Sequence, residues 1–154
     1  MSTITESVDV DVDVRTAYNQ WTQFESFPYF MEGVEEIRQL DAKTTHWVTK
    51  IGGITREFDA VITEQVPDER VAWKSVDGPN HAGVVTFHRL GDTSTRVTAQ
   101  MDVDPEGFVE NVADKLGVLK VRTKSDMKRF SVFIQNREGH ETGGWRGEID
   151  RPGK

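Results

Sequence analysis

The sequence of 154 residues contains no cysteine, and basic residues are fewer than acidic ones, 19 against 26. Without cysteine there are no disulfide frameworks, thiolate zinc sites, cysteine nucleophiles or cysteine-ligated iron–sulfur clusters. The formal net charge of −7 argues against a dedicated nucleic-acid-binding protein, because phosphate contacts require a basic surface. We therefore expect no nucleic-acid partner.

Long hydrophobic runs are also missing. No apolar segment approaches the roughly 20 residues that span a bilayer, and the first seven residues have neither a basic region nor an apolar run. We expect a cytoplasmic protein with no transmembrane segment. The length fits one domain with a core of its own. We place this domain at residues 1–138, followed by a flexible, Gly-rich tail at 139–154.

Alternation with a period of two marks the first strand. Valines at the even positions from 8 to 14 alternate with aspartates at 9, 11 and 13, which places the valines on one face and the carboxylates on the other. Helical spacing follows over 14–26, with Asp13 as the N-cap. A second short helix is expected, with Pro28 in its first turn and Gly33 at its end.

A long region of strands follows, broken by short turns. The predicted strands are 34–40, 43–51, 54–66, 70–76, 82–90 and 94–103. Short links between them favour antiparallel hairpins. The last element is an amphipathic helix of roughly 30 residues, about 45 Å long, whose apolar stripe runs from Phe108 to Ile134. A kink or break is expected near Gly117.

These elements predict an α+β fold. A curved, seven-stranded antiparallel sheet must cover one apolar face, and only the C-terminal helix is large enough to do so. The two short helices between the first and second strands would close one end. A curved sheet and a single helix often fail to fill the volume between them, which leaves room for a cavity there.

Several segments resemble a known superfamily. They are residues 21–31 (WTQFESFPYFM), Trp47, 56–59 (REFD), 67–73 (PDERVAW) and the long C-terminal helix. Together they are similar to the START-like, or SRPBCC, superfamily with the helix-grip fold, and most to its bacterial polyketide cyclase/dehydrase and coenzyme-Q-binding-like branch. The resemblance implies binding or transport of a small hydrophobic or amphipathic ligand, such as a lipid, an isoprenoid quinone or a polyketide.

Twelve residues are the candidates for lining a ligand cavity between the sheet and the helix. They come from the short helices, the inner face of the sheet and the long helix: Tyr29, Met31, Arg56, Phe58, Trp73, Val85, Phe87, Met101, Phe108, Val112, Leu116 and Leu119. The alternative is that these side chains simply fill the core, as aromatic and methionine stripes usually do.

Arg56 is the most informative polar residue, because its register places it on the apolar face. A buried guanidinium would anchor a carboxylate, a carbonyl or an enolate, whereas at the rim it would reach solvent or pair with Glu36. If the protein is a cyclase or dehydratase, Arg56 and Tyr29 are the expected catalytic pair. A third possibility is a protein-interaction module with a filled core that uses Trp145 and the tail.

No cofactor and no metal are predicted. The aspartates at 9, 11 and 13 imitate the start of a calcium loop, but the sixth position is Val14 and the twelfth is Gln20. The four histidines, at 46, 81, 88 and 140, are expected on loops, on outer faces or in the tail, which makes a carboxylate–histidine pair for proton transfer hard to build.

Overall fold

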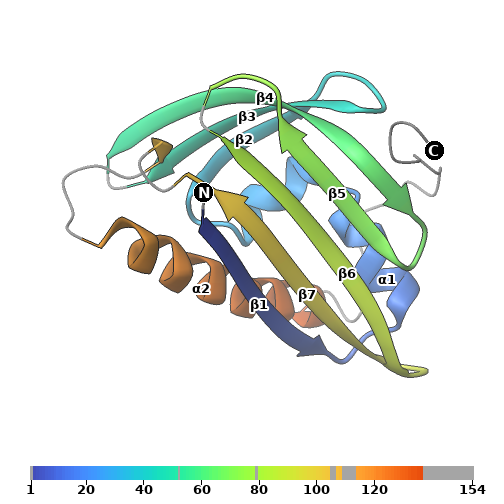
Figure 1. Ribbon diagram of the computed structural model, residues 1–154. Helices are drawn as coiled ribbons and strands as arrows, with labels where there is room; N and C mark the ends of the chain where they lie inside the picture. The colour runs from blue at the N-terminus through green and yellow to red at the C-terminus, as the bar shows by residue number, and fades with distance from the viewer. Residues whose placement is uncertain (1, 52, 79, 105–106, 109–113, 137–154) are drawn as a thin grey trace.

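The computed structural model describes residues 2–51, 53–78, 80–104, 107–108 and 114–136. A curved sheet wraps around one long helix (Figure 1). In chain order the elements are β1 (Ser2–Val10), α1 (Val14–Trp21), the 3₁₀ helix η1 (Phe24–Tyr29), β2 (Val34–Gln39), β3 (Thr44–Ile51), β4 (Ile54–Val66), β5 (Arg70–Ser75), β6 (His81–Gly91), β7 (Ser94–Val103) and α2 (Lys115–Asn136).

The seven strands form one antiparallel sheet in the order β1-β7-β6-β5-β4-β3-β2. The six strands predicted after the short helices are confirmed, with ends that differ by one residue at most. β2 is an edge strand with a register shift between Val34 and Glu36, which explains its imperfect alternation. The predicted α+β architecture is therefore confirmed.

The N-terminal segment differs from the prediction at both of its elements. β1 ends at Val10, and α1 begins at Val14 because the Asp13 carboxylate accepts a hydrogen bond from the Thr16 N–H at 2.9 Å, as predicted for an N-cap. The first helix does not reach residue 26. It ends at Trp21, and a 3₁₀ helix follows that carries Pro28 near its end rather than in its first turn.

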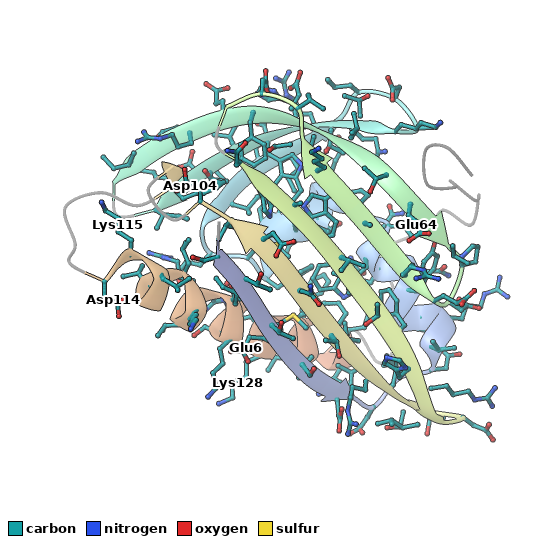
Figure 2. All side chains as sticks on the ribbon, in the orientation of Figure 1. Glu6, Glu64, Asp104, Asp114, Lys115 and Lys128 are labelled. Carbon is teal, nitrogen blue, oxygen red and sulfur yellow. The ribbon has the colours of Figure 1, made fainter. Side chains whose placement is uncertain are left out.

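The long helix covers the concave face of the sheet and packs along β1 (Figure 1). Its described part begins at Lys115, so Gly117 lies in the first turn and not at a mid-helix kink. The Gly117 N–H donates to the Asp114 carboxylate at 2.8 Å, which satisfies one free amide of this turn. Lys128 is exposed and points away from the sheet (Figure 2).

An aromatic cluster joins the C-terminal half of α2 to the short helices. Trp21 of α1 lies against Phe27 of η1, against Phe30 and against Phe130 of α2, with ring centroids 5.1, 5.5 and 5.0 Å away. All four side chains are buried. This end of the interior is closely packed, so any free volume must lie toward the other end of the helix.

Candidate ligand-binding cavity

One row of residues across the sheet forms the floor of a cavity. Ile4 of β1 lies opposite Met101 of β7, and Met101 lies opposite Gly83 of β6. Gly83 in turn lies opposite Trp73 of β5. Directly opposed residues on neighbouring strands project to the same face. A Cβ at Gly83 would lie 2.5 Å from Trp73 Cζ2, so the glycine leaves the space that the indole occupies.

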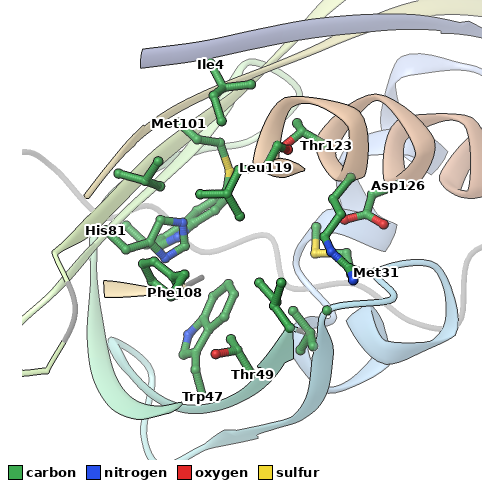
Figure 3. Close-up of a pocket in the computed structure, with 16 residues that line it drawn as sticks. Ile4, Met31, Trp47, Thr49, His81, Met101, Phe108, Leu119, Thr123 and Asp126 are labelled. Carbon is green, nitrogen blue, oxygen red and sulfur yellow. The ribbon is translucent and has the colours of Figure 1, made fainter. Parts of the chain in front are cut away.

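The cavity lies between this row, β3 and the first half of α2 (Figure 3). Its volume is about 90 Å³, whereas a single water needs only about 10–15 Å³ and pockets for drug-sized ligands measure about 300–1,000 Å³. The lining consists of Ile4, Met31, Gly33, Val34, Trp47, Thr49, Ile51, Trp73, His81, Met101, Val103, Phe108, Leu119, Arg122, Thr123 and Asp126. The cavity therefore has room for a small organic group, and a larger one requires movement of flexible side chains such as Met31 and Met101.

Aromatic rings form the inner end of the cavity. Trp47 stacks on Trp73 with centroids 5.9 Å apart and on Phe58 with centroids 5.7 Å apart. The Trp47 indole N–H donates to the Thr45 hydroxyl at 2.8 Å, which fixes the ring. Trp73 Nε1, also buried, has no hydrogen-bond partner among the described residues.

His81 lies within this aromatic end, which makes its predicted position on a loop or outer face wrong. Its ring is roughly perpendicular to those of Trp47, Phe58, Trp73 and Phe108, with centroids 5.5–6.0 Å away. The residue is 5% exposed, and neither ring nitrogen has a hydrogen-bond partner among the described residues. Burial lowers the pKa of His81 to about 4, so the imidazole is neutral near pH 7.

The opposite side of the cavity is polar. Asp126 of α2 faces His81 across the cavity (Figure 3). Its carboxylate accepts a hydrogen bond from the Glu32 N–H at 3.2 Å and another from the Arg129 guanidinium. Burial raises the pKa of Asp126, and the bond from Arg129 opposes this shift. Arg122 also lines this side, and its Nη1 lies 3.9 Å from Glu32 Oε2. Its buried Nε has no hydrogen-bond partner among the described residues.

Five of the twelve predicted residues line the cavity: Met31, Trp73, Met101, Phe108 and Leu119. Four others do not. Phe58 is buried against Trp47, Phe87 is buried against Tyr18 of α1, and Val85 is buried in the core. Leu116 is half-buried against the core. Val112 lies outside the described residues.

Tyr29 and Arg56, the predicted polar pair, do not line this cavity. Tyr29 is 72% exposed and stacks on Phe133 with centroids 5.9 Å apart. The 3₁₀ turn that buries Phe27 and Phe30 directs the Tyr29 ring outward. Arg56 is half-buried, and its Nε donates to the Gly107 carbonyl at 3.0 Å.

A carboxylate–histidine group does exist, contrary to prediction, on the outer face of the sheet. His46 Nδ1 lies 2.6 Å from Asp59 Oδ1, and its Nε2 lies 3.1 Å from Glu57 Oε1. The hydrogen bonds to Asp59 and then to Glu57 raise the pKa of His46. Among the described residues no three His, Asp or Glu side chains are grouped to hold a metal ion, and no helix is long and apolar enough to cross a membrane.

Comparisons with known proteins point to one family. Residues 10–131, more than half of the chain, match the family described as polyketide cyclase/dehydrase and lipid transport. The chain is 59% identical over 150 residues to an uncharacterised 17.2 kDa protein of Streptomyces lincolnensis, covering 97% of this chain and 99% of that one.

Solved structures show the same fold at low sequence identity. An aromatase/cyclase from Streptomyces sp. R1128 superimposes with a TM-score of 0.72 at 9% identity, over 89% of this chain and 95% of its own. A START superfamily protein from Mycobacterium smegmatis gives a TM-score of 0.68 at 13% identity, over 88% and 95%. The predicted helix-grip, START-like fold is therefore confirmed.

Proposed function

The chain belongs to the polyketide cyclase/dehydrase and lipid transport family, and from this premise we propose that it binds a small apolar or amphipathic molecule in the cavity between the sheet and α2. The observation that carries the proposal is the cavity itself. Its inner end is aromatic and its outer side carries Arg122 and Asp126. Such an arrangement suits a ligand with an apolar body and a polar end.

Most of the affinity would come from burial of the ligand's apolar surface, about 25 cal/mol per Å². Trp47, Trp73 and Phe108 offer rigid aromatic surface, and Met31 and Met101 can adapt to the ligand's shape. The small volume sets a limit on size. A ligand of one ring can be accommodated by side-chain movement alone, whereas a lipid or quinone would require α2 to move relative to the sheet.

Binding is a better-supported function than ring closure. The predicted catalytic pair, Arg56 and Tyr29, is absent from the cavity lining, since one donates to a backbone carbonyl and the other is exposed. The likeness to an aromatase/cyclase is a likeness of fold, and one fold serves many activities. For these two reasons we propose that the protein carries its ligand rather than converting it.

The proposal is tested with toluene as an apolar probe and with a variant that fills the cavity. Thr123 lines the cavity from α2, and its neighbour Lys124 is exposed. In Thr123→Phe the ring would occupy the cavity, so we expect toluene binding, followed by NMR titration, to be lost. Lys124→Phe adds the same ring one residue away and should bind toluene like the wild type.

Native mass spectrometry of the protein isolated from the cells that make it adds an independent measurement. A bound small molecule should accompany the wild type and be missing from Thr123→Phe. Equal toluene binding by the wild type and Thr123→Phe would contradict the proposal, because the probe would then bind elsewhere. Failure of the wild type to bind toluene at all would contradict it as well.

A further inference from the structure

His81 presents an unusual combination at the inner end of the cavity. It is 5% exposed, it lines the cavity, and both of its ring nitrogens lack a hydrogen-bond partner among the described residues. Buried polar atoms are nearly always hydrogen-bonded, because leaving one unsatisfied costs its full desolvation free energy. The structure therefore contains hydrogen-bonding capacity that the described residues do not use.

Trp73 adds to this capacity. Its indole N–H is also buried without a partner among the described residues, and its ring lies 6.0 Å from that of His81, centroid to centroid. Gly83, directly opposite Trp73, allows the indole to take this position, since any Cβ there would overlap the ring. Two unpartnered polar groups thus stand side by side in an otherwise aromatic environment.

The chemistry of these groups selects the ligand's polar group. A neutral imidazole has one N–H donor and one bare nitrogen acceptor, while the indole offers a donor only. A hydroxyl both donates and accepts, so it can donate to the bare nitrogen of His81 and accept from an N–H nearby. A carboxylate can only accept, and its charge belongs at the opposite side of the cavity, next to Arg122.

We infer that His81 is the specificity-determining residue of the cavity. Its imidazole binds the hydroxyl group of a small ligand whose apolar part lies against the aromatic rings of Trp47 and Trp73. This inference rests on the proposed function, because it requires that a ligand enter the cavity. It goes further by naming the ligand's polar group and the residue that recognises it. The competing explanation is that an ordered water occupies the inner end, since 90 Å³ is ample for one.

Phenol and toluene distinguish these explanations, because they have nearly the same size and differ by a hydroxyl in place of a methyl group. We expect the wild type to bind phenol about ten times more tightly than toluene in NMR titrations, the effect of one net hydrogen bond at a buried site. In His81→Phe the aromatic surroundings are kept and the ring nitrogens are removed. Its toluene binding should persist while the preference for phenol disappears.

His88→Phe is the matched control, because His88 lies on the same strand with its side chain exposed; it should keep the wild-type preference. The ¹⁵N resonances of the His81 imidazole in the wild type provide a measurement that does not depend on a variant. They should shift when phenol binds and remain nearly unchanged with toluene.

Equal affinities for phenol and toluene in the wild type would overturn the inference and favour the ordered water, while the proposed function would stand because toluene is bound. A preference for phenol that survives in His81→Phe would also overturn the role of His81. If neither compound binds the wild type, the proposed function fails, and the inference fails with it.

Discussion

Gly83 and Trp73 show how one missing side chain shapes the cavity. The two residues are direct cross-strand partners, and the indole lies where the Cβ of any other residue would be. Trp73 then stacks on Trp47, which holds the aromatic wall in place. The position of the Trp73 ring in the cavity wall thus depends on Gly83, which is not itself among the lining residues.

Gly83→Ala should therefore destabilise the protein. A Cβ 2.5 Å from Trp73 Cζ2 forces the indole to shift, and overpacking of this kind costs about 1–3 kcal/mol. A Cβ at Gly91, on the same strand, would have no heavy atom of another residue within 4 Å beyond its two chain neighbours. Gly91→Ala is therefore the control and should change the free energy of unfolding little. Urea denaturation measures both, and equal stabilities for the two variants would contradict the prediction.

His81 should make stability depend on pH. Burial depresses its folded-state pKa from 6.5 to about 4, so the unfolded chain binds a proton more readily than the folded one. Stability is then fully present above pH 6.5 and falls as the pH decreases toward 4, by about 3 kcal/mol in all. The other ionisable side chains in the cavity lining are Arg122 and Asp126.

The measurement is the free energy of unfolding as a function of pH for the wild type and His81→Phe. Carboxylates titrate in both proteins, so the informative quantity is the difference between the two curves. We expect the wild type to lose stability more steeply than the variant between pH 6.5 and about 4. Parallel curves in this interval would show that His81 is solvated.

The alternation of residues in β6 contained the information needed to place His81 inside. Residue 81 lies an even number of positions from Val85 and Phe87, so it faces the same side of the sheet as these two buried residues. His88 lies an odd number of positions away and faces the other side. The prediction failed because the strand was expected to start at 82. The exposed position of Tyr29 could not be read from the sequence, because a 3₁₀ turn has no strong sequence signal that distinguishes it from an α-helix.

At the scale of elements, the start of α2 is fixed by its cap. The Asp114 carboxylate accepts from the Gly117 N–H at 2.8 Å, and a Cβ at 117 would lie 2.2 Å from Asp114 Oδ2. The glycine that the sequence suggests as a kink is thus the residue that leaves room for the cap. Asp13 plays the corresponding role for α1 through the Thr16 N–H.

Asp114→Ala should lower the free energy of unfolding by about 1 kcal/mol, because a helix amide loses its partner. Asp114→Asn keeps a side-chain oxygen at the same place and should lose only a fraction of this. Chemical denaturation of the three proteins provides the comparison. Unchanged stability in Asp114→Ala would show that the bond contributes nothing to the folded state.

At the scale of the whole molecule, the interior has two unlike ends. Phe130 is fully buried in the aromatic cluster, whereas Leu119 lines the cavity. Phe130→Ala should cost about 3–5 kcal/mol and Leu119→Ala about 2–5 kcal/mol. Because Leu119→Ala enlarges the cavity, toluene should raise its melting temperature more than that of the wild type, through binding to the folded state.

Calorimetry with and without toluene tests this contrast. Toluene should raise the melting temperature of Phe130→Ala no more than that of the wild type, because the space left by the Phe130 ring is separate from the cavity. An equal gain for both variants would mean that the two ends of the interior are not distinct. A smaller gain for Leu119→Ala than for the wild type would mean that its side chain is itself needed for binding.

The overall architecture was predictable from the sequence because period-two strands, turn residues and one amphipathic helix leave few arrangements. The cavity was predictable only in its general position. Met101 and Trp73 could be assigned to the inner face by alternation, but the register that brings Ile4, Met101 and Trp73 into one row depends on pairing between distant strands. Local patterns do not specify which part of an apolar face stays unfilled.

The two halves of α2 pack differently, and this difference affects how a ligand would enter and leave the cavity. The C-terminal half of this helix is held by the rings of Trp21, Phe30 and Phe130, while its first half contributes Leu119, Arg122 and Thr123 to the cavity lining. Tilting the helix about its fixed half would widen the opening without unpairing a single strand. Passage would then depend on the movement of this helix, while the sheet keeps its strand pairing.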